Sequence, residues 1–292
     1  MSPELAFLQA LNGISFGALL FILAAGLSLI FGMMDVVNLA HGAFYMLGAY
    51  IALSVVRTTG SFWVALVAVP LALGALGLVV EPLLLRRLRG RHLDQVLITV
   101  GVALVITDLI RLKPDWGAEV RTLPPPDALA GSIAILGNDY PVYRLFVIAF
   151  GVTLALSLAA LHRRSRAGAL IRAGVDDAQM LSALGVDTDR LFAVTYAIGA
   201  ALAGLAGVVA APVLGLQPGM DVEALVLSLI VVVVGGLGTL GGAQVGAALV
   251  GPADTFGKVF VPQFALFFIF AIMALVLLLR PSGLLGRIRV IR

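Results

Sequence analysis

Few residues in this sequence could perform catalysis or hold a metal ion, and they are widely spaced. The chain has three histidines, His41, His92 and His162, and no cysteine. The lack of cysteine excludes disulfides, thiolate chemistry and cysteine-ligated metal sites. No Ser–His–Asp set and no pair of carboxylates falls at one level of the long apolar segments, as an active site would require. The sequence therefore predicts no catalytic residue, no metal site, no cofactor and no enzymatic activity.

A polar group around His41 is the first candidate for function. Asp35, Asn38, His41 and Gly42 lie within one short stretch, and Asn38 and His41 are three residues apart, hence on one helix face. Polar groups inside a membrane span are costly and mark functional sites by default. Two interpretations remain open. The stretch could begin a half-helix that lines a transport path, or it could cap a helix near the inner interface, with His41 bonded to a neighbouring helix.

A run of glycines around residues 235–242 is the second candidate. The stretch Gly236-Leu237-Gly238-Thr239-Leu240-Gly241 matches the GxGxxG pattern of dinucleotide-binding folds. That pattern requires a βαβ unit and an acid about 20 residues further on. Here the glycines lie inside the uncharged run Ala224 to Ala253, and no phosphate-binding GxxxxGK[ST] motif occurs. The sequence therefore argues against nucleotide binding, and any ATP and Mg²⁺ would be bound by a partner chain.

The polar loop at about 163–190 is the third candidate and the most informative. The stretch Arg172 to Asp187 predicts a short helix, with Asp176 and Asp177 in its first turn and Gly185 at its C-terminal cap. Three residues form an apolar stripe at a spacing of three to four: Met180, Leu181 and Leu184. An amphipathic helix of this kind lies on lipid or docks in a groove on a partner. Because its polar face is acidic, the sequence favours a protein partner.

The elements that position these candidates are membrane helices. The chain has 292 residues, of which 61% are hydrophobic and 12% charged, whereas soluble domains carry about 25% charged residues. Several uncharged runs reach the roughly 20 residues that a spanning helix needs. They are apolar on every face, unlike the alternating strands of a barrel. We expect an all-α polytopic bundle of about eight or nine membrane segments in a single domain, 1–292.

The basic residues set the expected topology. Of 19 lysines and arginines, 13 fall in three clusters: Arg86, Arg87, Arg89 and Arg91; Arg163, Arg164, Arg166, Arg172 and Arg190; and Arg280, Arg287, Arg289 and Arg292. Basic loops stay cytoplasmic, which places the N-terminus outside and the C-terminus inside. Clusters at helix ends also explain the net charge of +3 without nucleic-acid binding. Glu81, five residues before Arg86, predicts an interfacial ion pair with a snorkelling arginine.

Helices are expected at about 5–32, 36–56, 62–85, 93–111, 141–161, 191–213 and 263–279, with an external loop at 112–140. The segment 222–257 is ambiguous, because glycine in a helix interior is destabilising by up to about 1 kcal/mol relative to alanine. It could form two full spans or a re-entrant pair that enters from outside. Glycine pairs such as Gly13 and Gly17 predict close helix packing.

Four stretches together resemble the branched-chain amino-acid permease family of ATP-binding-cassette (ABC) importers, in the first of its two permease types. They are residues 38–50 (NLAHGAFYMLGAY), 172–190, 233–242 (VVGGLGTLGG) and 280–286 (RPSGLLG). They follow the family's order and spread over nearly the whole length. The loop itself is similar to the coupling loop of such importers, in which an acidic residue and alanine precede a glycine. Aspartate stands here where glutamate is typical.

The resemblance implies a permease subunit that translocates branched-chain or other amino acids, delivered by an external solute-binding protein. It also implies two cytoplasmic ATP-binding subunits, a second related permease subunit in a hetero- or homodimer, and a bacterial inner-membrane location. The implied coupling residues are Arg172, Asp176, Asp177, Ala178, Met180, Leu181, Leu184 and Gly185. The implied translocation-path residues are Asn38, His41, Gly42, Gly235, Gly236 and Gly238.

The substrate stays open at this point, because relatives of this type handle branched-chain amino acids, urea, short amides or aromatic acids. An alternative function is a stand-alone secondary transporter or channel. Asp35, His41 and the glycine break would suit the interrupted helices of such transporters, but the sequence offers no clear acid in mid-span for ion coupling.

Overall fold

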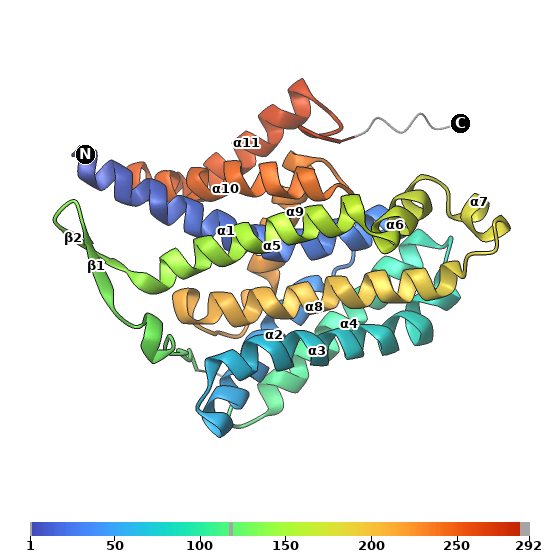
Figure 1. Cartoon of the computed structure of the whole chain (residues 1–292), viewed down its shortest axis with the longest axis horizontal. Helices are drawn as coiled ribbons and strands as arrows, with labels where there is room; N and C mark the ends of the chain where they lie inside the picture. Colours follow the sequence, from blue (N-terminus) through green and yellow to red (C-terminus); the bar gives the residue numbers. More distant parts are fainter. Residues whose placement is uncertain (1, 117–118, 287–292) are drawn as a thin grey trace.

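The computed structural model describes residues 2–116 and 119–286 and shows a bundle of long helices running roughly side by side (Figure 1). This confirms the expected polytopic helical fold. The α-helices are α1 Pro3–Met34, α2 His41–Thr59, α3 Phe62–Val80, α4 His92–Leu112, α5 Val142–Arg164, α6 Arg166–Asp176, α7 Ala178–Ala183, α8 Thr188–Leu214, α9 Met220–Gly235, α10 Leu240–Phe260 and α11 Ala265–Leu279. The shorter elements are the π-helical turn η1 Glu81–Leu85, the 3₁₀ turns η2 Arg86–Leu88, η3 Asp127–Leu129 and η4 Pro262–Phe264, and the strands β1 Ser132–Ile135 and β2 Asn138–Pro141.

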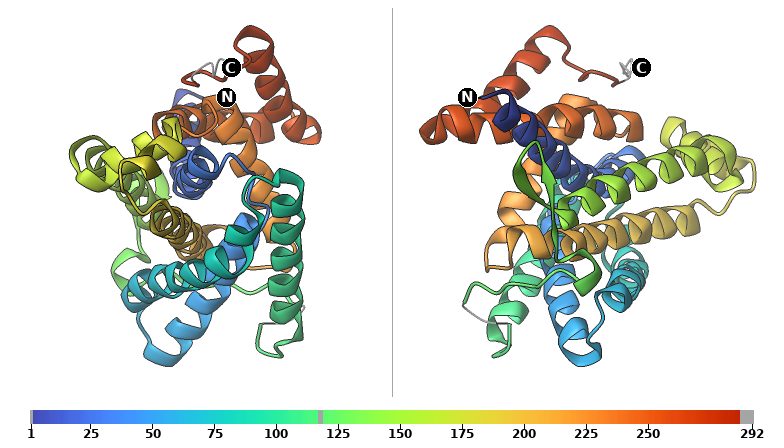
Figure 2. Two further views of the ribbon diagram at one scale, coloured as in Figure 1. Left: turned by 90° about the vertical axis from the view of Figure 1, so that its right-hand side faces the viewer. Right: turned by 60° about the vertical axis from the view of Figure 1, so that its left-hand side comes forward.

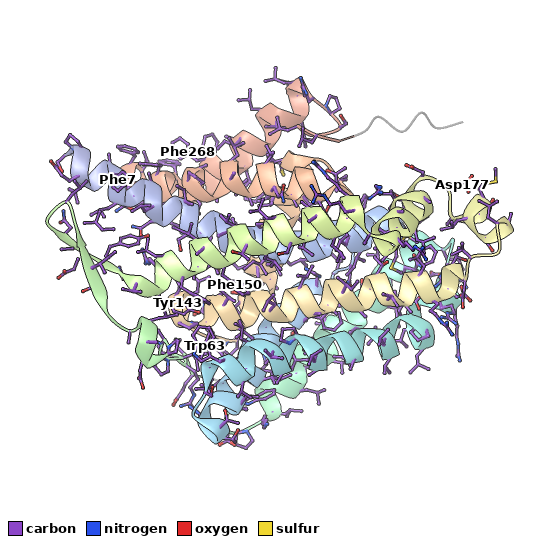
Figure 3. The ribbon with its side chains drawn as sticks, viewed as in Figure 1. Phe7, Trp63, Tyr143, Phe150, Asp177 and Phe268 are labelled. Carbon is purple, nitrogen blue, oxygen red and sulfur yellow. The ribbon has the colours of Figure 1, made fainter. Side chains whose placement is uncertain are left out.

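The bundle has two distinct ends. The antiparallel β1–β2 hairpin, with Ser132 opposite Pro141, lies at one end, which we call the hairpin end. Helices α6 and α7 project from the other end, which we call the α7 end (Figure 1). Figure 3 shows Asp177 at the α7 end, far from Phe7 near the hairpin end. The expected topology makes the α7 end cytoplasmic. The hairpin lies within the external loop that the sequence predicted, but its strands were not predicted.

Helices α1 and α8 form the centre of the bundle. In their most apolar stretches, 78% of α1 and 67% of α8 residues are buried, compared with 11% for α5. Because apolar side chains on α3, α4 and α5 face outward, those helices are placed to meet lipid. Figure 2 shows α11 at the edge of the bundle beyond α10, with α2, α3 and α4 at the opposite edge.

Glycines allow the central helices to approach closely, as the sequence predicted. Helix α10 runs antiparallel to α1, and a Cβ atom added to Gly17 would lie 2.8 Å from the carbonyl oxygen of Ala247. A Cβ on Gly207 of α8 would lie 2.2 Å from the carbonyl oxygen of Tyr45 on α2. In lipid, where water does not drive helices together, such backbone proximity is a main source of association.

Five described helices are long and apolar enough to cross a membrane: α1, α3 with its η1–η2 extension, α4, α5 and α8. Helices α9 and α10 qualify only together and are bent by 113° at the glycines. The break lies beside Gly32 of α1, and α10 returns to place Pro252 beside Gly13 near the hairpin end. The prediction of a broken helix at 222–257 is therefore correct, although the described spans are fewer than the eight or nine segments expected.

Two expected elements need correction. The second helix begins at His41 rather than at 36, because residues 35–40 fold back along α1 before the helix starts. The helix expected over Arg172–Asp187 is two helices, α6 and α7, separated at Asp177, whose backbone is extended (φ −159°, ψ 99°). Of the third arginine cluster, Arg280 follows α11 directly, whereas Arg287, Arg289 and Arg292 lie outside the described residues.

Candidate functional site

Helix α7 and its C-cap residue Leu184 carry the three apolar residues that the sequence singled out, of which two are exposed. The Asp177 side chain caps the helix, since its Oδ1 accepts a hydrogen bond from the Met180 amide at 2.8 Å. Met180 and Leu184, four residues apart, are 61% and 75% exposed, whereas Leu181 is buried at 6%. Leu181 therefore packs against the rest of the protein, and the two large apolar side chains of Met180 and Leu184 are left exposed.

The other predicted coupling residues lie around this turn. Ala178 is its first residue, and Gly185 follows it with φ +85°, the left-handed conformation expected of a C-terminal glycine. Arg172 and Asp176 instead belong to α6, and Asp176 ends that helix rather than beginning the next. The prediction that both aspartates occupy one first turn was therefore wrong: Asp177 is an N-cap and Asp176 a C-terminal residue.

The polar start of α2 is buried among the helices. The Oδ1 atom of Asn38 accepts a hydrogen bond from the Ala40 amide at 3.1 Å, and the Nε2 atom of His41 lies 2.9 Å from the carbonyl oxygen of Leu23 on α1. A Cβ atom on Gly42 would lie 2.1 Å from the carbonyl oxygen of Asp221 on α9. The bond of His41 to a neighbouring helix is therefore confirmed, but the expected cap is not, because Ala40 is the N-cap residue of α2 and no side chain caps this helix. The role of these residues in a transport path stays a prediction.

The glycine break joins α1, α10 and the segment after α11. A Cβ on Gly238 would lie 2.8 Å from the Cα atom of Gly32, and a Cβ on Gly236 would lie 2.3 Å from the Gly286 amide nitrogen. The Leu285 amide donates to the carbonyl oxygen of Gly235 at 2.8 Å. Two of the stretches that carry the family resemblance, 233–242 and 280–286, therefore pack on each other.

The predicted path residues lie at two levels of the bundle. Gly238 lines a cavity of about 580 Å³ at the α7 end, together with Asp35, Arg172 and Asp176. His41 contacts α1 at Leu23, nine residues before Gly32, and at 1.5 Å per residue this separates the two groups by about 14 Å. The sequence grouped them by family resemblance, whereas the structure places them at different depths.

A second cavity, of about 250 Å³, lies toward the hairpin end between α1, α2, α8, α9 and α10. We call it the hairpin-end pocket. Its wall is mostly apolar, but it contains the charged side chains of Glu223 and Lys258 and the polar side chains of Tyr45 and Gln217. Sequence reasoning missed these residues. Their signal was present, because Glu223 and Lys258 are isolated charges that border long uncharged runs.

Two buried acids also lie near this pocket, toward the ends of α9 and α10 rather than in mid-span. Asp254 is buried and accepts a hydrogen bond from the Nζ atom of Lys258 at 2.7 Å. Asp221 is buried in the first turn of α9 and accepts a hydrogen bond from the Oγ1 atom of Thr107 at 3.0 Å. Across residues 2–116 and 119–286, no three metal-ligating side chains gather in a group that could hold a metal ion.

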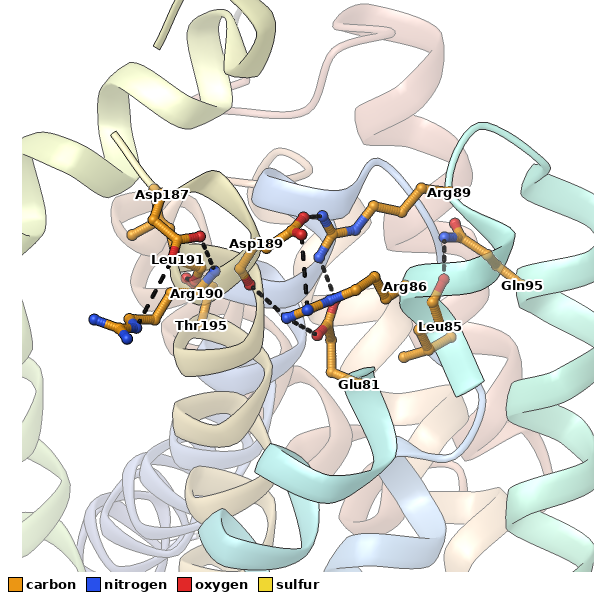
Figure 4. Close-up of polar contacts among 10 residues, drawn as sticks. All are labelled: Glu81, Leu85, Arg86, Arg89, Gln95, Asp187, Asp189, Arg190, Leu191 and Thr195. Carbon is orange, nitrogen blue, oxygen red and sulfur yellow. Dashed lines mark hydrogen bonds and ion pairs between the residues drawn. The ribbon is translucent and has the colours of Figure 1, made fainter. Parts of the chain in front are cut away.

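A network of four charges joins α3 to α8 near the α7 end (Figure 4). Its members are Glu81, Arg86, Arg89 and Asp189, and we call it the charge network. Glu81, whose side chain is fully buried, pairs with Arg89 and lies 3.8 Å from Arg86. Both arginines also reach Asp189 in the first turn of α8. The sequence predicted the pair of Glu81 with Arg86 but not the links to Arg89 and Asp189.

Known proteins resemble this chain over nearly its full length. A family described as the permease component of branched-chain amino acid transport systems matches residues 9–277. The high-affinity branched-chain amino acid transport permease BraD of Pseudomonas aeruginosa is 32% identical, with 96% of this chain and 95% of that protein covered. LivH of Escherichia coli K12, a permease of the same description, is 29% identical, with 97% and 96% covered. No solved structure is significantly similar to the chain.

Proposed function

Since this chain belongs to the family of branched-chain amino acid transport permeases, we propose that it is the membrane-spanning subunit of an ATP-driven importer. It is a multi-pass membrane protein, as its apolar helices and its relatives agree. In the proposed assembly it pairs with a second, related permease and receives branched-chain or other amino acids from an external binding protein. Two cytoplasmic subunits bind ATP and Mg²⁺ and hydrolyse the nucleotide.

The exposed pair Met180 and Leu184 on α7 is the observation that carries this proposal. Two large apolar side chains on one short helical turn, beyond the membrane bundle, match the way a helix enters a groove on a partner protein. A lipid contact would favour basic residues on the polar face, yet Asp176 and Asp177 lie next to this turn. The proposed occupant of the surface is therefore an ATP-binding subunit.

The mechanism follows from where α7 is attached. Helix α7 lies between α6, which follows α5, and α8, which runs through the centre of the bundle. When the ATP-binding subunits close, they would draw the α7 helices of the two permeases together. The pull on α5 and α8 would then tilt the bundles and open the path toward the binding protein. No covalent chemistry takes place in this chain.

Leu184→Asp tests the proposal. A charge at a well-packed contact typically costs 2 kcal/mol or more, so subunit docking should weaken by about 30-fold. We expect ATP-dependent uptake into proteoliposomes to fall to near background and the ATP-binding subunits to be lost on purification. Ile133→Asp is the matched control, because Ile133 is an exposed apolar residue in β1 at the opposite end.

Undiminished ATP-driven uptake by Leu184→Asp would contradict the docking role of α7. Gradient-driven uptake by the purified chain alone, without ATP-binding subunits, would favour the stand-alone transporter instead.

A further inference from the structure

We propose that the hairpin-end pocket binds a zwitterionic α-amino acid with an apolar side chain, with Glu223 contacting its ammonium group and Lys258 its carboxylate. The inference rests on the proposed function, since it assigns a substrate site within the same transport path. Neither the sequence nor the family relationship singled out this pocket.

The two charges in the pocket are available to a ligand. Glu223 is exposed and forms no ion pair with any residue of the described chain. Lys258 uses one of its three ammonium protons on Asp254, and its side chain is 56% exposed. The pocket thus has one carboxylate, Glu223 on α9, and one ammonium group with free donors, Lys258 on α10. These two groups are complementary to the two charges of an amino acid.

The rest of the pocket suits a small aliphatic or aromatic side chain. Leu19, Leu20 and Leu23 of α1 line one side, and Met220, Ala224 and Leu227 of α9 line another. The volume of about 250 Å³ is just below the roughly 300–1,000 Å³ of sites for drug-sized ligands. Sites for small molecules are mostly apolar, with a few polar groups that fix orientation, and the pocket has this composition.

The position of the pocket fits entry from the side of the binding protein. Gly215 and Gln217, in the connection between α8 and α9, border it at the hairpin end. The expected topology places this end outside. At greater depth it reaches Leu23, whose carbonyl oxygen bonds to the ring of His41. A ligand that entered from outside would thus stop at the level where His41 of α2 is bonded to Leu23 of α1.

The lack of cysteine in the chain gives a direct test. Gln217→Cys would place the only thiol at the pocket's border, where its rate of maleimide labelling reports occupancy. In membranes holding the whole transporter, L-leucine at ten times its dissociation constant should slow labelling about tenfold. Isoamylamine, which lacks the carboxylate, and 4-methylpentanoate, which lacks the ammonium group, should protect far less. Leu214→Cys offers a second reporter if the first variant fails to assemble.

Ser282→Cys, in the cavity at the α7 end, is the control reporter and should label at the same rate with or without leucine. Adding Glu223→Gln to the Gln217→Cys reporter should abolish protection by leucine, and Glu223→Asp should restore part of it. Equal protection by all three compounds would overturn the zwitterion assignment, because the pocket would then recognise apolar bulk alone. A lack of protection by leucine would overturn the site altogether.

The test separates this inference from the proposed function. If leucine leaves labelling unchanged while the wild-type transporter shows ATP-driven leucine uptake, the pocket assignment fails and the importer stands. If the chain assembles with no ATP-binding subunit and shows no such uptake, the importer itself fails, whatever the labelling shows.

Discussion

Two acidic residues in this bundle, Glu81 and Glu223, have opposite surroundings. Glu81 is fully buried near the α7 end and is held by Arg86 and Arg89 (Figure 4). Glu223 borders a cavity toward the hairpin end and has no ion-pair partner within the described residues. A buried charge must be paired because its desolvation is costly, whereas a charge that faces a cavity keeps its capacity to bind. We therefore assign Glu81 to stability and Glu223 to ligand binding.

The surroundings of Glu81 and Glu223 differ because different helices meet at the two ends of the bundle. The charge network closes a contact between the end of α3 and the first turn of α8, directly after α7. Arg89 also lies over the ring of Phe192 at 4.2 Å from its centroid, which adds a cation–π contact to the same junction. At the hairpin end, by contrast, five helices surround the pocket without filling it.

The largest expected effect comes from removing the buried acid. Glu81→Ala would leave Arg89 without its interior partner, and breaking a buried pair in this way costs about 3 kcal/mol. The free energy of unfolding in detergent, measured by denaturant titration, should fall by that amount. Asp94→Ala is the control, because the pair of Asp94 with Arg91 is largely exposed and should contribute at most about 1 kcal/mol. If the free energy of unfolding fell equally in the two variants, burial would not distinguish the ion pair of Glu81 from that of Asp94.

A smaller effect is expected at the exposed side of the same network. The side chain of Asp189 is 52% exposed, so Asp189→Asn should lower the free energy of unfolding by about 1 kcal/mol. A double-mutant cycle with Arg89→Met would isolate the energy of their contact. A coupling energy near zero would mean that the network stabilises the fold through Glu81 alone.

The smallest effect on stability is expected in the pocket. Glu223→Gln should change the free energy of unfolding by no more than about 0.5 kcal/mol, as is usual for an exposed substitution away from a paired network. Leucine uptake per ATP hydrolysed should nevertheless fall. A destabilisation as large as that of Glu81→Ala would contradict the comparison, because Glu223 would then be a structural residue.

Local features of the fold followed from the sequence because they depend on neighbouring residues. Ser2 caps α1 through a neighbouring residue, since its side-chain oxygen accepts a hydrogen bond from the Leu5 amide at 3.3 Å. Gly185 adopts positive φ after α7, as expected of a glycine at a helix C-terminus. The glycines at 235–242 break the helical segment between α9 and α10, as predicted. Of the predicted apolar stripe at α7, Met180 and Leu184 are exposed, whereas Leu181 is buried.

Three features depended on contacts between distant segments, and sequence reasoning missed or misplaced them. The network joins Glu81 to Asp189 through the arginines, across 108 residues of sequence (189 − 81). The segment 35–40 brings the buried His41 against Leu23 of α1, a contact that the sequence did not specify. The hairpin-end pocket draws residues from α1, α2, α8, α9 and α10.

The sequence by itself determined the class of protein, the location of most helices, the break at the glycines and the apolar turn at α7. Each of these follows from local rules, because a chain in lipid must satisfy its backbone hydrogen bonds within each helix. Only the tertiary structure decided which helices adjoin and which charges become paired or face a cavity. Small residues recur on many helix faces and permit many close contacts, so the spacing of residues along the chain does not select among them.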